Sequence, residues 1–206
     1  MWDQSHGLLR HVVDAQLVAG WVNGTTRFDG DSENDRLCSE FVEVADRTYR
    51  LAPAANYEGL LLNWRPRARN LEADWACNAA LDAQTHFSWF AEPREAPDLT
   101  RYNYTLYSDG GQRDADEGAP DRRTSVCGWA IRRVSRNAAS ELVALGATTV
   151  PGRPTVPNLE LMGAVEVQKQ WHRLWDPEPP DEYLRETIVH MMLPRFLQAV
   201  TGASHW

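Results

Sequence analysis

Two strand-like runs that lie far apart in the chain each end in an aspartate, and this pairing constrains the fold more than any other feature. Residues 8–13, LLRHVV, precede Asp14, and residues 102–108, YNYTLYS, precede Asp109. Short apolar or alternating runs of this kind predict β-strands. Ligands collect where the strands of an α/β sheet end. The two aspartates are therefore candidates for one site, although each alone fits a helix N-terminus or a turn.

Hydrophobic periodicity divides the chain into two halves, each with strands and helices. The predicted helices are 15–22, 36–51, 71–83 and 158–175, and the predicted strands are 8–13, 58–64, 102–109, 126–135 and 141–150. Residues 84–102 are rich in proline and polar residues, which predicts a linker. The composition of residues 110–124 predicts a charged insert. The strand before this insert and the two strands after it predict an antiparallel meander. A chain of 206 residues with 43% hydrophobic content can bury one full core, so we predict a single α/β domain.

Composition restricts the compartment and the kind of partner. A formal net charge of −8 argues against a broad basic surface, because non-specific nucleic-acid binding depends on Lys and Arg that neutralise phosphates. Three cysteines without metal-ligand spacing fit buried, reduced thiols. No apolar run reaches membrane-spanning length, and the N-terminus lacks the apolar stretch of a signal peptide. We therefore predict an intracellular protein, cytoplasmic or nuclear, that is not secreted.

Two further acids occupy unusual positions. Asp74 and Glu160 lie in the first turns of helices that are otherwise apolar on their core-facing side. A carboxylate on such a face costs several kcal/mol unless it is paired or bound to a metal ion. Four acids at strand ends and helix starts therefore predict a cation site. Oxygen ligands suit Mg²⁺, with Mn²⁺ as a substitute.

The local sequence around all four acids resembles the ribonuclease H-like superfamily, especially its retroelement and plant-type members. LYSDGG resembles the first strand of the family, and TVPNLELMGAVEVQ resembles its first helix, with Glu160 in the place of the metal-binding Glu. VVDAQLVAGWVNG resembles the fourth strand and the helix that follows it. LLLNWRPRARNLEADWACNAALD resembles the fifth strand, an arginine-bearing loop and the last helix. The resemblance covers residues 8–83 and 103–175.

The order of these pieces is exchanged relative to the family, in which the segments bearing Asp109 and Glu160 come first. A circular permutation accounts for the exchange and predicts a ribonuclease H-like mixed five-stranded sheet flanked by helices. In this arrangement 1–83 is the second half of the fold, 84–102 the linker, 103–175 the first half and 176–206 a C-terminal helical extension, together forming one domain. The alternative is an excerpt from tandem domains, whose halves exchange between two molecules or form no stable core.

The resemblance implies a two-metal ribonuclease that hydrolyses the RNA strand of RNA–DNA hybrids. Its catalytic residues and ligands for two Mg²⁺ ions would be Asp109, Glu160, Asp14 and Asp74. Its substrate-binding residues would be Arg65, Arg67, Arg69, Gly110, Gly111, Gln16 and Asn158. The implied partners are an RNA–DNA hybrid or RNA, and also a reverse transcriptase or a second copy that exchanges half-domains, but no membrane. A solvated turn is the alternative role for the arginines, and a helix cap is the alternative for Asn158.

Two departures from the family bear on activity. Many members carry a histidine in the loop where this chain has RPRARN, and no histidine falls between residues 58 and 74. The acidic insert after Gly111 would also repel phosphate beside the site. These departures leave two alternatives to a nuclease. One is a catalytically inactive module, derived from a retroelement ribonuclease H, that binds nucleic acid or protein. The other is a non-functional translated fragment.

Overall fold

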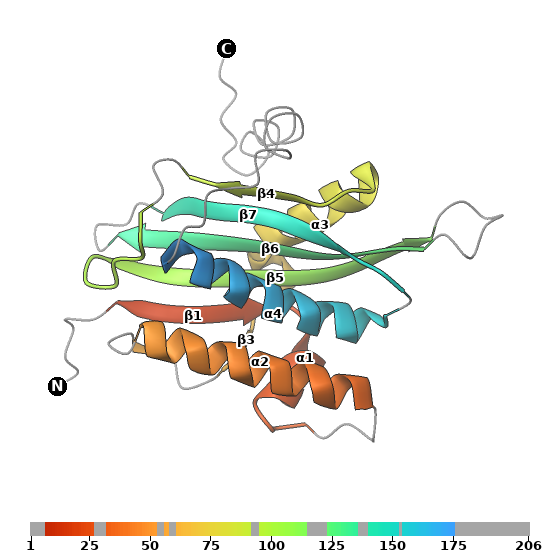
Figure 1. Cartoon of the computed structure of the whole chain (residues 1–206), viewed down its shortest axis with the longest axis horizontal. Coiled ribbons are helices and arrows are strands. Elements are labelled where there is room, and N and C mark those ends of the chain that lie inside the picture. The colour runs from red at the N-terminus through yellow and green to blue at the C-terminus, as the bar shows by residue number, and fades with distance from the viewer. Residues whose placement is uncertain are drawn as a thin grey trace, which may run out of the picture.

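A mixed β-sheet lies at the centre of the molecule, with helices on both of its faces (Figure 1). The computed structural model describes residues 7–26, 32–52, 56–57, 61–91, 95–114, 123–135, 140–152 and 154–175. The strands are β1 (Leu8–Val13), β2 (Asn56–Tyr57), β3 (Asn63–Trp64), β4 (Phe87–Phe90), β5 (Tyr102–Asp114), β6 (Arg123–Ser135) and β7 (Ser140–Val150). The helices are α1 (Gln16–Val22), α2 (Ser32–Leu51), α3 (Leu71–Ala83) and α4 (Val156–Trp175), with one 3-10 turn, η1 (Arg67–Arg69).

The two halves of the chain share this sheet. Its strand order is β2-β1-β5-β6-β7-β4, and β3 also pairs with β1. Strand β1 runs parallel to β5 on one side and parallel to the short strands β2 and β3 on the other. Strands β5, β6 and β7 form the predicted antiparallel meander, and β4 pairs antiparallel with β7 at the far edge. The pairing of β1 with β5 therefore joins the halves within one molecule.

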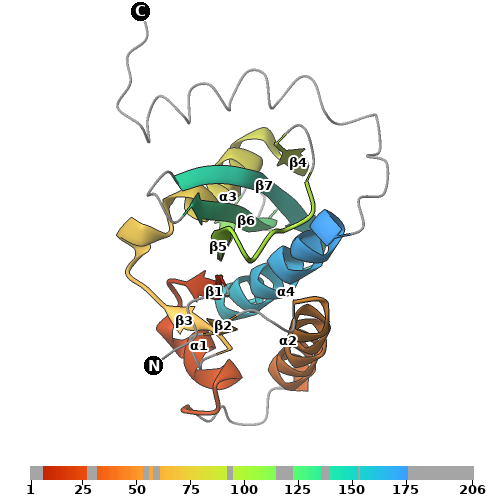
Figure 2. The same ribbon diagram turned by 90° about the vertical axis from the view of Figure 1, so that its left-hand side faces the viewer.

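Helices α3 and α4 cover opposite faces of the sheet (Figure 2). Adjacent residues of a strand point to opposite faces, and the neighbours Gly110 and Gly111 on β5 face α4 and α3, respectively. Helix α2 packs against α4 and also reaches β1, where the ring centroid of Phe41 lies 5.5 Å from that of His11. Trp129 and Trp171 are fully buried between the sheet and α4. The sheet thus has α3 on one face and α4, with α2 beside it, on the other.

Several elements match their predicted positions, because their local signals are strong. Helix α3 spans the predicted residues 71–83, and α4 begins only two residues before the predicted start. Helix α2 begins at Ser32 and not at residue 36. Its first turn carries Glu33 and Asp35, which favour a helix N-terminus. All three cysteines are free, and two of them are buried, as predicted.

Two segments predicted to be irregular contain strands. The predicted linker 84–102 includes β4, and both ends of the predicted insert 110–124 are strand, since β5 extends to Asp114 and β6 begins at Arg123. In these segments the partner strand supplies the stabilising backbone hydrogen bonds, which local composition does not reveal. The predicted strand 58–64 is reduced to β3, and residues 58–60 lie outside the described part of the chain.

The predicted C-terminal extension, 176–206, also lies outside the described residues. Within the ranges given above, no helix combines the length and apolar character needed to cross a membrane.

Candidate metal centre

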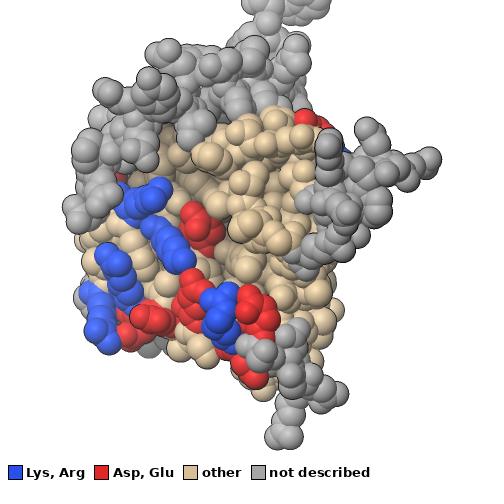
Figure 3. Space-filling view, turned by 45° about the vertical axis from the view of Figure 1, so that its right-hand side comes forward, with Lys and Arg blue, Asp and Glu red and all other residues tan. Residues whose placement is uncertain are grey.

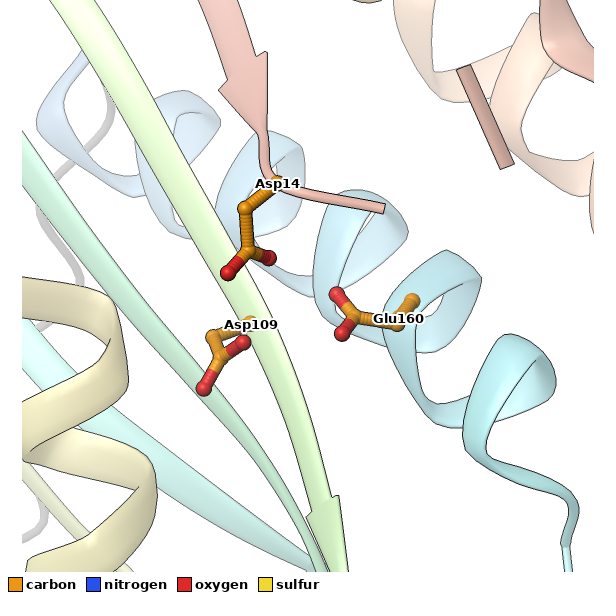
Figure 4. Close-up of side chains that lie close together, drawn as sticks. All are labelled: Asp14, Asp109 and Glu160. Atoms are coloured by element: carbon orange, nitrogen blue, oxygen red, sulfur yellow. The ribbon is translucent and has the colours of Figure 1, made fainter. Parts of the chain in front are cut away.

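Three of the four predicted acids come together beside strand β5. Asp14 follows β1, Asp109 lies on β5 and Glu160 lies near the start of α4. Each offers a carboxylate oxygen, and these oxygens all lie within 4.8 Å of one another. Figure 4 shows the three side chains pointing toward a common space from three different elements. We call this group the carboxylate triad.

The register of β1 against β5 sets the first pair of the triad. Val13, the last residue of β1, pairs with Ser108. Asp14 therefore leaves the sheet beside Asp109, the next residue on β5. Strand β5 itself continues beyond this point because it pairs with β6 as far as Asp114. Asp109 was predicted to end its strand, but it lies within β5. The strand that ends here is β1, and Asp14 follows its last residue.

A backbone-to-backbone contact brings the third acid into place. A Cβ atom on Gly110 would lie 2.5 Å from the backbone nitrogen of Glu160, and one on Gly163 would lie 2.9 Å from the carbonyl oxygen of Asp109. Any larger residue at Gly110 would push α4 away from β5. The two glycines therefore fix the depth of α4 on the sheet, and with it the approach of Glu160 to Asp109.

The triad concentrates negative charge in a buried place. Asp109 is 4% exposed and Glu160 is 7% exposed. Glu160 Oε2 has no hydrogen-bond partner within the described residues. Burial, followed by repulsion from Asp14 and Asp74, raises the pKa of Asp109 to about 7. Burial, followed by repulsion from Asp109 and Asp14, raises the pKa of Glu160 to about 9. Clustering of the acids thus adds to burial in raising the proton affinity of both carboxyls.

These features fit a hard divalent cation. A buried carboxylate oxygen without a partner costs free energy that a cation would recover. Mg²⁺ and Mn²⁺ prefer oxygen ligands and keep some of their water when bound to a few carboxylates. The triad supplies such oxygens from Asp14, Asp109 and Glu160, and Asp14 is the most exposed of the three. The triad could therefore hold one divalent ion.

The fourth predicted ligand stands apart from the triad. Asp74 lies in the first turn of α3, as predicted, but its carboxylate accepts a hydrogen bond from the guanidinium of Arg67 and forms an ion pair with it. Asp74 is not part of the group whose oxygens lie within 4.8 Å. Its charge still acts on the triad, since it contributes to the raised pKa of both Asp14 and Asp109. The prediction of four converging acids thus holds for three.

The predicted arginines border the site, and Gln16 follows it. Arg67 and Arg69 on η1 are exposed, while Arg65 is partly buried and donates to the carbonyl oxygen of Trp64. Gln16 is exposed at the start of α1, two residues after Asp14. Gln16 lies on the segment that follows Asp14, and the three arginines lie on the segment that leads into α3.

The other predicted substrate contacts have packing roles in this structure. The space beside Gly110 is filled by α4 and that beside Gly111 by Cys77 and Leu81. Asn158 is buried, and its backbone nitrogen donates to Thr155 Oγ1. Asn158 therefore does not cap the helix itself. Close packing of the helices explains these three residues without a substrate.

Asn70 is a site residue that sequence reasoning missed. Its side chain is fully buried, and Nδ2 donates to the carbonyl oxygen of Ser108 at 2.8 Å. It also hydrogen-bonds with Asp14 and lowers the pKa of that carboxyl, which burial raises. An asparagine directly before an apolar helix is typical of a helix cap, so its position gave no functional signal. In the structure it makes no such cap and instead ties the start of α3 to β5.

Trp64 and His11 also support the triad. The indole Nε1 of Trp64 donates to the carbonyl oxygen of Asp14 at 3.0 Å. His11 is buried between Ser108 Oγ at 3.3 Å and Gln168 Nε2 at 3.2 Å. Burial lowers the pKa of His11 to about 3, so it is a neutral core residue. Hydrogen bonds thus fix the residues next to both aspartates.

The charged surface agrees with the acidic composition. Figure 3 shows positive and negative side chains intermingled on one face of the molecule, without a continuous basic surface. On helices α2 and α4, for example, Arg36 pairs with Glu33 and Glu40, and Lys169 pairs with Glu40. Any phosphate contact must therefore be local.

Comparison with known proteins identifies no family. No family model matches the chain, and no curated protein matches it. Among solved structures, the PelC dodecamer from Paraburkholderia phytofirmans is 12% identical, with 80% of this chain and 88% of that chain covered and a TM-score of 0.30. A TM-score this low does not indicate a shared fold. Function must therefore follow from the site.

Proposed function

We propose that this chain is a metal-dependent nuclease with a circularly permuted ribonuclease H-like fold, which hydrolyses the RNA strand of RNA–DNA hybrids. The observation that carries the proposal is the convergence of Asp14, Asp109 and Glu160 from segments that are distant in the sequence. Each of these acids stands in a segment that resembles a carboxylate-bearing segment of that superfamily. A chance cluster of acids has no reason to select those three positions.

The arrangement of the sheet supports the permutation. A permuted fold requires the strand before Asp14 to lie parallel to the strand bearing Asp109, with the following strand on its outer side. Strand β1 does lie between β5 and the short strands β2 and β3, and all these neighbours are parallel to it. One chain therefore supplies every strand that this arrangement requires.

The side chains of the triad define what the site would hold. Asp14, Asp109 and Glu160 would bind a divalent ion such as Mg²⁺, with Mn²⁺ as a substitute. Such an ion lowers the pKa of bound water and neutralises charge on a phosphodiester. Trp64 holds the backbone of Asp14, and Asn70 holds that of Ser108 beside Asp109, so that the segments carrying both carboxylates are fixed. The raised pKa values of Asp109 and Glu160 mean that protons compete with the ion below about pH 7–9.

The arginine loop supplies local positive charge for the substrate. Arg67 and Arg69 are exposed on the turn before α3, and Arg67 acts electrostatically on all three acids of the triad. The planar guanidinium group matches a phosphate in a bidentate manner. In an RNA–DNA hybrid, the 2′-hydroxyls of the RNA strand are exposed in a wide minor groove. We expect the hybrid to bind with its backbone across this loop and the triad.

An end-labelled RNA–DNA hybrid tests the proposal directly. The purified chain should cut the RNA strand in Mg²⁺ or Mn²⁺, and EDTA should stop the reaction. Asp109→Asn should abolish cutting while the protein remains folded. Asp82→Asn is the matched control, because Asp82 is an exposed acid paired with Arg113, and it should retain activity. A folded protein that neither binds a divalent ion nor cuts the hybrid would refute the proposal.

A catalytically inactive binding module is the second candidate. The ion pair of Arg67 with Asp74 favours this candidate, because Asp74 is then not available as a fourth metal ligand. This candidate predicts binding of the hybrid without turnover, even in Mn²⁺. Cleavage in the assay above would exclude it.

A further inference from the structure

Arg67 places a positive charge at the centre of the acidic site. Its guanidinium forms an ion pair with Asp74. Burial raises the pKa of Asp14, Asp109 and Glu160, and Arg67 acts in the opposite direction on all three. The electrostatic reach of this one side chain therefore covers all four acids, which makes Arg67 part of the site and more than a surface residue near it.

The ion pair divides the acids into two sets. Asp14, Asp109 and Glu160 form one set, with oxygens within 4.8 Å, and Glu160 Oε2 in this set is buried without a described partner. Asp74 forms the other, and Oδ1 of its carboxylate accepts a hydrogen bond from Arg67. A divalent ion at Asp74 would meet the guanidinium at close range. Like charges at one carboxylate repel, so the ion and Arg67 exclude each other.

Arg67 can leave Asp74 only by moving. A guanidinium remains protonated at any physiological pH, and the hydrogen bond that it donates to Asp74 raises the pKa of Arg67 further. Its side chain is 68% exposed, whereas that of Asp74 is 23% exposed. Because one partner of this ion pair is exposed and flexible, rotation of Arg67 into solvent can free Asp74. A second ion must supply the free energy of that separation before it can bind.

We propose that Arg67 is a resident counter-cation of Asp74 that competes with a second divalent ion, so that the resting chain binds one ion and Arg67 controls access of another. The inference rests on the proposed function, because it assumes that the triad holds the first ion. It assigns Arg67 a role beyond substrate contact and makes it a positioning residue for the metal centre.

The number of Mn²⁺ ions bound per chain tests this inference without any measurement of cleavage. Titration calorimetry near pH 8, without nucleic acid, should give one ion for the unmodified chain and two for Arg67→Gln. The affinity for the second ion should rise at least about tenfold, the smallest shift that loss of a neighbouring opposite charge usually produces. Arg69→Gln, on the same turn but without the ion pair to Asp74, should still give one ion.

A double variant identifies the carboxylate involved. Combining Arg67→Gln with Asp74→Asn should restore a count of one, because the second ion then has no ligand on α3. Thermal melting of each variant confirms that it is folded. Equal ion counts in the unmodified chain and Arg67→Gln would overturn the role of Arg67 and leave the triad intact. Binding of no ion by any of these proteins would overturn the proposed function itself.

Discussion

Replacing Glu160 with glutamine should stabilise the metal-free protein at alkaline pH. The side chain is 7% exposed, and Oε2 has no partner within the described residues. Burial and the nearby Asp109 raise its pKa to about 9. The Glu160→Gln change keeps the shape of the side chain and removes the group that ionises. The variant therefore isolates the cost of placing this carboxyl beside two others.

The sign of the effect follows from proton binding. The folded state binds the Glu160 proton more tightly than the unfolded state, in which the pKa is near its ordinary value of 4.5. The stabilisation is complete below about pH 4.5 and is lost as the pH rises toward 9. Each pH unit in this window changes the free energy of unfolding by about 1.4 kcal/mol. Between pH 5 and 8 we expect Glu160 to cost roughly 2–4 kcal/mol, the lower value applying if the acids of the triad share one bound proton.

Chemical denaturation at pH 5 and pH 8, each with EDTA and with Mn²⁺, measures this cost. In EDTA, Glu160→Gln should be more stable than the unmodified chain at pH 8, and the difference should shrink at pH 5. Mn²⁺ at one hundred times its dissociation constant should stabilise the unmodified chain by about 2.7 kcal/mol. The variant should gain little. Glu166→Gln, a partly exposed glutamate on the same helix, should follow the unmodified chain.

A specific result would refute this reasoning. If Glu160→Gln were no more stable than the unmodified chain at pH 8 in EDTA, the carboxyl could not be a buried, strained charge. The fit of the triad to a cation would then lose its main physical basis, because the unsatisfied oxygen is what a cation would relieve.

Three further predictions concern the scaffold, and thermal or chemical denaturation checks each one. Gly110→Ala should destabilise the fold by about 1–3 kcal/mol and weaken Mn²⁺ binding, because the added carbon meets the backbone of Glu160. Stability should fall as the pH drops from 6.5 toward 3, since burial lowers the pKa of His11 to about 3, and His11→Gln should lose less. Arg132→Gln should cost about 2 kcal/mol by leaving buried Glu72 without its ion pair.

The sequence predicted correctly those elements whose own residues favour their secondary structure. Helix α3 occupies its predicted residues 71–83, because its alanine and leucine content favours helix in any context. Strand β4, in contrast, consists of four residues in a polar, proline-rich segment. Its pairing with β7 provides its backbone hydrogen bonds, and a partner distant in sequence leaves no periodic pattern. Short edge strands of this kind are missed for a physical reason.

The candidate site likewise contains residues that the sequence predicted and one contact that it did not. Asp14, Asp109 and Glu160 stand at recognisable junctions, and the pairing of β1 with β5 brings them together as expected. The capture of Asp74 by Arg67 depends on how the η1 turn folds back on α3. Two residues seven positions apart across a turn have no fixed spacing that predicts contact. The position of the acid could therefore be predicted, but its partner could not.

The segment between the halves gives a physical argument that the two halves form one domain. A loose linker would leave its own backbone groups and the edge of β7 exposed, and an exposed edge invites association with other chains. Instead β4 covers that edge, and the carbonyl oxygen of Leu99 accepts a hydrogen bond from the backbone nitrogen of Gly7, just before β1. The backbone nitrogen of Asp98 donates to the hydroxyl of Tyr104 on β5 at 3.1 Å. A segment that contacts both halves in this way couples their folding, which a fortuitous excerpt of two tandem domains would have no reason to do.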